Sequence, residues 1–225
     1  SFAAASRRDP GRLRIALSMR IPFSIMPATL DGQVRAQVER LAGVLTDLGH
    51  DIVDADPRYG WIGADFMPRS LAGVREWSKR VPDTAALDPR TRHNATIGRL
   101  LCGPLLKLAR ASEPLLHRRV GSIFKQVDVV LTPTTAQPPL RAAALDGLTS
   151  YATDRTIVGA CPYAWPWNVL GWPGVNVPAG FTAGGLPVGA QLLGPACSEP
   201  LLISLAAQLE SVERWDLRWP EVVAG

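Results

Sequence analysis

Near the start of the chain, two short runs typical of strands flank a stripe of hydrophobic positions that has the period of a helix. Residues 13–18 (LRIALS) form a short, mostly apolar run that predicts a strand. A helix over about residues 32–48 is predicted next, because apolar side chains recur there every three or four positions: Val34, Val38, Leu41, Leu45 and Leu48. Gly49 supplies the left-handed residue that ends many helices, and residues 51–55 (DIVDA) predict a second strand. A strand, a helix and a strand at this spacing make a βαβ unit, which indicates an α/β protein.

The middle of the chain is predicted to hold several short helices and then a buried strand. Between about residues 66 and 116 the helical pattern is interrupted by prolines that end or kink helices: Pro68, Pro82, Pro89, Pro104 and Pro114. We expect a further helix over about residues 115–126. It leads into residues 128–131, a β-branched run that stops at Thr132-Pro133-Thr134 and predicts a central strand.

The last third of the chain predicts a hairpin and a final helix. Residues 174–178 (GVNVP) and 187–193 (PVGAQLL) predict two strands joined by a turn that contains Gly184-Gly185. We expect residues 128–131 and 174–178 to be buried on both faces, as strands covered by helices are. The helix over about residues 199–213 is expected to start at the N-cap Ser198, with one apolar face made of Leu202, Leu205, Leu209 and Val212.

Composition narrows the class of protein. The 225 residues are 47% hydrophobic and 20% charged, which is ordinary for one folded, soluble unit. No apolar run approaches the ~20 residues of a membrane span, and residues 1–14 lack an apolar signal core, so we expect a cytoplasmic protein with no membrane partner. The three cysteines are far apart and the histidines show no ligand spacing, which favours reduced thiols and predicts no metal site.

The net charge of +4 raises the question of a nucleic-acid partner. Of the 24 basic residues 21 are arginines, but they are scattered along the chain with only short groupings such as His117-Arg118-Arg119. No recognised binding motif accompanies them, so we expect no nucleic-acid binding.

Short hydrolase motifs give no convincing catalytic site. Ser122 and Lys125 match a Ser-x-x-Lys pattern, but its companion motifs are absent, and Ile123 and Phe124 fit a helix that packs into a core. The chain contains no Gly-x-Ser-x-Gly elbow and no His-Glu-x-x-His motif.

Longer motifs carry a family resemblance. Residues 128–134 (DVVLTPT), 166–173 (PWNVLGWP), 177–181 (VPAGF) and 185–194 (GLPVGAQLLG) resemble, in order and spacing, the closing motifs of the amidase signature family. Residues 14–17, 48–50 and 87–92 are also similar to that family's second half. The resemblance implies an α/β/α layered fold on a mixed sheet, in which residues 1–225 are the carboxy-terminal part of a single amidase domain whose amino-terminal half is missing.

The resemblance also implies where catalysis takes place. In the family a serine is activated by a second serine and a lysine, all in the first half, and hydrolyses a carboxamide to a carboxylic acid and ammonia or an amine. This chain has no Ser-Ser pair, and Lys79, Lys107 and Lys125 lie in no similar context. We therefore predict no catalytic residue, no cofactor and no activity of the chain alone. Its expected partners are a small-molecule amide and the missing half, and homo-oligomerisation is left open.

Substrate-binding residues follow from the same resemblance. Thr132, Pro133 and Thr134 are expected beside the acyl pocket, although a simple strand-ending turn is an equal alternative. Trp165, Trp167 and Asn168 could line an apolar pocket, with core packing the alternative for at least one tryptophan. Cys161 matches a position that, in the glutamine-dependent transamidation branch, looks like an aspartate. An uncharged thiol there favours an amidase for uncharged amides.

Two alternatives remain at this point. The first is a non-catalytic amidase-like fragment or accessory subunit that acts by binding, and the second is an unrelated binding module. A segment upstream that bears a Gly-Ser-Ser-Gly-Gly run would favour the intact enzyme over the first, whereas the second would require the ordered motifs to be coincidence.

Overall fold

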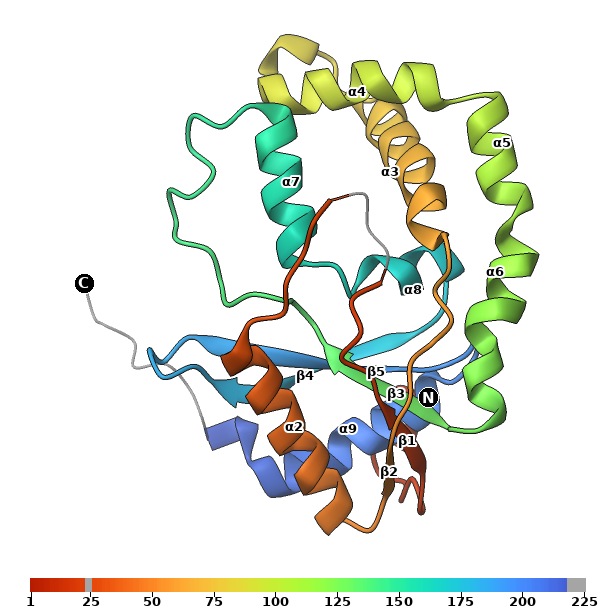
Figure 1. The fold of residues 1–225 in the computed structure, drawn as a ribbon, viewed down its shortest axis with the longest axis vertical. Helices are drawn as coiled ribbons and strands as arrows, with labels where there is room; N and C mark the ends of the chain where they lie inside the picture. Colours follow the sequence, from red (N-terminus) through yellow and green to blue (C-terminus); the bar gives the residue numbers. More distant parts are fainter. Residues whose placement is uncertain (23–25, 218–225) are drawn as a thin grey trace.

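A mixed β-sheet lies between two layers of helices in the computed structural model, which describes residues 1–22 and 26–217 (Figure 1). The sheet formed by these residues has the order β2-β1-β3-β5-β4. Its strands are β1 (Arg14–Leu17), β2 (Asp51–Asp54), β3 (Val129–Pro133), β4 (Gly174–Phe181) and β5 (Pro187–Leu193). β1, β2 and β3 are parallel, while β5 runs antiparallel to both β3 and β4. The expected α/β/α fold on a mixed sheet is confirmed.

Helices cover the two faces of the sheet unequally. One face of the sheet carries α2 (Gly32–Asp47) and α9 (Glu199–Glu213). The remaining larger helices lie on the opposite side of the sheet (Figure 1). These are α3 (Ile62–Ser78), α4 (Pro89–Leu101), α5 (Pro104–Ala111), α6 (Glu113–Val120), α7 (Ser150–Ala160) and α8 (Trp165–Leu170). Short elements complete the set: α1 (Phe2–Ala5) and the 3₁₀ turns η1 (Thr84–Ala86), η2 (Gly121–Lys125) and η3 (Trp215–Leu217). Every helix in the described ranges falls short of the length and hydropathy of a membrane span.

The first βαβ unit forms as its residue pattern predicts. Asp31 caps α2, because its carboxylate accepts hydrogen bonds from the backbone amides of Gln33 and Val34. The apolar stripe of α2 is buried as far as Leu45, and Gly49 adopts a left-handed φ of +93° that ends the helix. β1 and β2 then pair in parallel, with Ile15 opposite Ile52.

β3 is the central strand, as predicted, and every one of its residues is buried. Successive side chains point to opposite faces. Val129 and Leu131 contribute to the core beneath α2 and α9, whereas Val130 contributes to a second core with residues of α3, α6 and α8.

β4 corrects the expectation that residues 174–178 are buried on both faces. Val177 and Ala179 are buried against the α2 and α9 side, but Asn176 and Pro178 on the other face are exposed. β4 lies at the edge of the sheet that the described residues form, and no helix of those residues covers its second face. The alternation in β4 is that of a half-covered strand.

Two helix expectations also need correction. The helix predicted at 115–126 is α6 followed by the tighter 3₁₀ turn η2, within which Ile123 is buried as expected. Ser198 does precede α9, but its hydroxyl donates to the carbonyl of Pro195 and makes no capping bond. Leu202, Leu205 and Leu209 are buried, whereas Val212 is 49% exposed, so the buried face of α9 does not include it.

Candidate functional site

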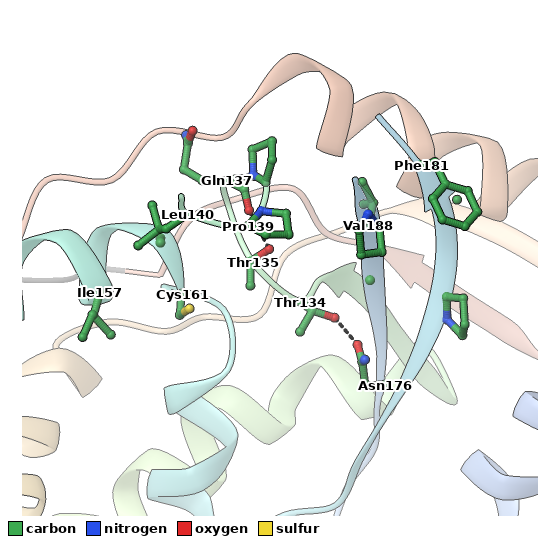
Figure 2. A pocket seen from close by; sticks show the side chains of 16 residues that line it. Thr134, Thr135, Gln137, Pro139, Leu140, Ile157, Cys161, Asn176, Phe181 and Val188 are labelled. Atoms are coloured by element: carbon green, nitrogen blue, oxygen red, sulfur yellow. Dashed lines mark hydrogen bonds between the residues drawn. The ribbon is translucent and has the colours of Figure 1, made fainter. Parts of the chain in front are cut away.

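An open pocket of about 520 Å³ lies at the carboxyl end of β3, above the uncovered face of β4 and β5 (Figure 2). Its walls come from the segment after β3, from the last turns of α7 and from the β4–β5 hairpin. The lining residues are Thr134, Thr135, Gln137, Pro138, Pro139, Leu140, Ile157, Ala160, Cys161, Asn176, Pro178, Gly180, Phe181, Pro187, Val188 and Gly189.

Backbone hydrogen bonds hold the first wall in place. The amide of Ala136 donates to the carbonyl of Ala160 at the end of α7, with a donor–acceptor distance of 2.7 Å. The carbonyl of Ala136 accepts from the amide of Asp31, the N-cap of α2. The segment after β3 is therefore bonded to two helices, which fixes the opening between it and the hairpin.

A polar pair forms part of the pocket floor. The hydroxyl of Thr134 donates a hydrogen bond to Oδ1 of Asn176, across β5 (Figure 2). Both side chains lie directly over Gly189, where an added Cβ would be 2.9 Å from the Asn176 oxygen and 3.0 Å from the Thr134 oxygen. A side chain at position 189 would displace the oxygens of this pair.

The rest of the lining carries no charge, and apart from Thr135, Gln137 and the thiol of Cys161 its side chains are apolar. Leu140, Ile157 and Phe181 expose 44%, 44% and 47% of their surface around the opening. Cys161 is half-buried, and burial raises the pKa of its thiol, so the side chain is neutral at neutral pH. Within the described residues no group of three or more His, Cys, Asp or Glu side chains could hold a metal ion. The pocket can therefore enclose an uncharged, largely apolar group, with a few polar atoms to orient it.

Two of the predicted site residues line this pocket, and two lie just behind it. Thr134 and Cys161 are in the lining. Thr132 and Pro133 are buried within β3, where the carbonyl of Pro133 accepts from the Thr132 hydroxyl and from Nε2 of Gln191. These two residues fix the end of the strand from which Thr134 projects.

The remaining predicted residues lie elsewhere in the fold. Trp165 and Trp167 are buried in the second core, at 5% and 3% exposure, and are absent from the pocket lining. Nε1 of Trp167 donates to the carbonyl of Gly194 at 3.0 Å, and Trp165 packs against Phe66 with ring centroids 5.2 Å apart. Asn168 is exposed on α8. In the described structure the tryptophans pack the core, which was the alternative for at least one of them.

The contribution of α7 and of the connection after β3 was not predictable from any motif in the sequence. Ile157 and Ala160 come from a helix that no motif identified, and Pro138, Pro139 and Leu140 come from a segment interpreted only as a connection. The available signal in the sequence was Leu140, which follows two prolines in a stretch without charge. It becomes informative only when α7 is known to lie opposite.

Comparison with known proteins agrees with this architecture. The model of the Amidase family matches residues 1–203. The Mycobacterium tuberculosis protein named "Putative amidase AmiA2" is 51% identical over 95% of this chain and 44% of its own length. A second protein of the same organism, named "Putative amidase AmiB2", is 39% identical over 98% of this chain and 48% of its own length.

The fold similarity extends to solved structures. The structure of 6-aminohexanoate cyclic dimer hydrolase matches with a TM-score of 0.79 at 22% identity, over 98% of this chain and 49% of that one. The chain thus spans about half the length of the relatives it matches, consistent with the carboxy-terminal half expected from its motifs. With a family model matched over most of its length, the chain belongs to the amidase signature family.

Proposed function

We propose that this chain forms one wall of the substrate pocket in an amidase that hydrolyses a carboxamide to a carboxylic acid and ammonia or an amine. The observation that carries the proposal is the pocket at the end of β3, whose sixteen lining residues include no charged side chain. Membership of the amidase family supports amide hydrolysis as the reaction, and the uncharged lining supports an uncharged amide as the substrate.

The preferred substrate is a neutral amide with an apolar acyl group. A charged substituent would lose its water against Leu140, Ile157 and Phe181 without gaining a counter-charge, which is costly. Cys161 strengthens this inference, because a neutral thiol cannot pair with the ammonium group of an amino-acid amide. The Thr134–Asn176 pair offers the polar atoms that would orient the amide.

The proposal assigns supporting roles to the other predicted residues. Thr132 and Pro133 hold the strand end behind Thr134. Trp165 and Trp167 hold α8 in the core, and contact of either ring or of Asn168 with substrate stays a prediction. We further propose that residues 1–225 belong to one amidase domain, and that the nucleophile and its base come from the complementary half. The three free cysteines support a reducing compartment such as the cytoplasm.

A hybrid enzyme tests the proposal. The segment of AmiA2 that matches this chain would be replaced by residues 1–225, and hydrolysis of acetamide, hexanamide, benzamide and glycinamide would be measured for AmiA2, the hybrid and the isolated chain. We expect the hybrid to prefer hexanamide and benzamide over glycinamide, and the isolated chain to be inactive. A hybrid that is folded but hydrolyses none of the amides accepted by AmiA2 would favour a non-catalytic, binding role.

A substitution in the pocket makes the test specific. Ile157→Asp in the hybrid places a charge among the apolar lining, and we expect the ratio of kcat/KM for hexanamide over acetamide to fall by about tenfold or more. Tyr151→Asp is the matched control, because Tyr151 lies on the same helix, is 64% exposed and is outside the pocket. Equal ratios in the two variants would show that α7 does not contact the acyl group.

A further inference from the structure

Four arginines that are far apart in the sequence come together on the surface. Arg20, Arg58 and Arg119 line a hollow of about 410 Å³. Arg58, Arg118 and Arg119 line a second hollow of about 370 Å³. The two hollows adjoin, because Arg58 and Arg119 belong to both, and we call the combined feature the arginine cleft.

The topology explains why these residues meet. Arg20 follows β1 and Arg58 follows β2, and the carboxyl ends of adjacent parallel strands lie at the same edge of a sheet. Arg118 and Arg119 are in the last turn of α6, which packs beside the segment that links β2 to α3 (Figure 1). Residues that looked scattered along the chain are thus concentrated by the fold.

The guanidinium of Arg119 lies directly beside a glycine of the segment that links β2 to α3. A Cβ added at Gly60 would be 2.7 Å from Nε and 2.8 Å from Cζ of Arg119, so the guanidinium of Arg119 lies directly against the glycine. Gly60 also has a left-handed φ of +55°, a backbone conformation that residues with a side chain rarely adopt. The guanidinium of Arg119 therefore occupies the space that a side chain at position 60 would fill.

The arginines of the cleft have no ion-pair partner among the described side chains. Among the residues whose side chains the structure describes, no carboxylate forms an ion pair with any of the four arginines, and no acidic residue lines either hollow. Asp56 and Arg20 are both near enough to Tyr59, which lines one hollow, for their charges to affect the pKa of its hydroxyl. Asp56 accepts a hydrogen bond from the hydroxyl of Ser18 at 2.8 Å. Like charges held together repel one another unless an anion lies between them.

We propose that the arginine cleft binds a small anion of the pyrophosphate class, free or as part of a nucleoside diphosphate. Guanidinium groups match phosphate oxygens with paired, charge-assisted hydrogen bonds, and several of them converge here on a confined space. An extended nucleic acid would need a basic stripe along the surface, whereas these charges occupy one hollow. The cleft shares no lining residue with the proposed substrate pocket, so the anion site is separate from it.

Calorimetric titration of the chain and of the AmiA2 hybrid with inorganic pyrophosphate tests the proposal, with ADP in a second series to learn whether a nucleoside contributes. We expect pyrophosphate to bind both proteins and the combined substitution Arg58→Gln with Arg119→Gln to weaken binding by at least about tenfold. Arg110→Gln with Arg99→Gln is the matched control, because it removes the same charge from exposed positions outside the cleft and should change binding less than about twofold.

Three results would overturn the proposal. The first is the absence of pyrophosphate binding at low ionic strength in both folded proteins. The second is equal weakening by the cleft and control variants, which would show attraction to net charge only. The third is tighter binding of a hexaglutamate peptide than of pyrophosphate, which would assign the cleft to an acidic protein segment. Gly60→Ala gives an independent check, since it should weaken pyrophosphate binding by displacing Arg119 while all four arginines remain.

Discussion

The hydroxyl of Thr134 and the side-chain oxygen of Asn176 are hydrogen-bonded across β5, directly above Gly189. Three strands therefore meet at one point of the pocket floor. The relationship depends on the absence of a side chain at Gly189, and it leads to the first prediction.

We expect Gly189→Ala to lower the free energy of unfolding by about 1–3 kcal/mol, the usual cost of overpacking a tight site. The added methyl group would press on the oxygens of both Thr134 and Asn176. Gly184→Ala is the control, because its nearest neighbour would be 3.8 Å away. Urea unfolding of the two variants measures the difference, and equal midpoints would contradict the packing described here.

Trp167→Phe should destabilise the chain through a lost hydrogen bond as well as lost volume. The substitution leaves the buried carbonyl of Gly194 without the donor Nε1, a change that costs about 1–3 kcal/mol. Trp77, which is 67% exposed, provides the control, since Trp77→Phe should change stability by less than about 0.5 kcal/mol. Thermal and urea denaturation would show whether the two variants differ as expected.

His50 and Gln208 should be energetically coupled. The backbone amide of Leu13 donates to Nδ1 of His50, so the proton of the neutral ring is on Nε2, which donates to Oε1 of Gln208 at 2.9 Å. Each of His50→Leu and Gln208→Leu removes one partner of this bond. A double-mutant cycle should give a coupling free energy of about 0.5–1.5 kcal/mol, and additive effects would show that the bond contributes nothing.

The reactivity of Cys161 should report its surroundings. Burial raises the pKa of this thiol, and only the thiolate reacts with iodoacetamide. Alkylation of Cys161 should therefore reach half its maximal rate at a higher pH than an unburied cysteine, whose reference pKa is ~8.5. Mass spectrometry of a peptide containing Cys161, sampled over a pH series, gives the midpoint. A midpoint below that of a free cysteine peptide would refute the assignment, and protection by hexanamide in the hybrid would place the thiol beside bound substrate.

Asp88 should remain ionised to low pH and hold the start of α4. Hydrogen bonds from Arg90 lower the pKa of this carboxylate to about 2. The bond from the Arg90 side chain has the larger effect, and the bond from the Arg90 backbone amide the smaller one. Because the folded-state pKa lies below the unfolded value of ~3.9, the stabilisation is complete above that value and is lost as the pH falls through about 2. Carboxyl-detected NMR titration would give the pKa, and a value near 4 would contradict the contact.

Local patterns in the sequence determined the order and type of most elements. The stripe ending at Leu45 and the glycine at position 49 specified α2 and its end, because helix periodicity and left-handed φ are properties of neighbouring residues. The central position of β3 followed from its β-branched run. The ordered motifs between residues 128 and 194 predicted the family, because they preserve both residue types and spacing.

Only the tertiary structure decided what those elements contact. Asn176 and Ile157 became pocket residues because β4 is uncovered on one face and α7 ends opposite it, and no local pattern specifies either fact. The ring of Trp167 lies in the core, where its Nε1 donates a hydrogen bond to the carbonyl of Gly194, 27 positions away. The arginines of the cleft were dispersed in the sequence and were concentrated by the parallel pairing of β1 and β2 and the packing of α6. Contacts between distant segments depend on how whole elements pack against one another, whereas periodicity reports only which face of each element is apolar.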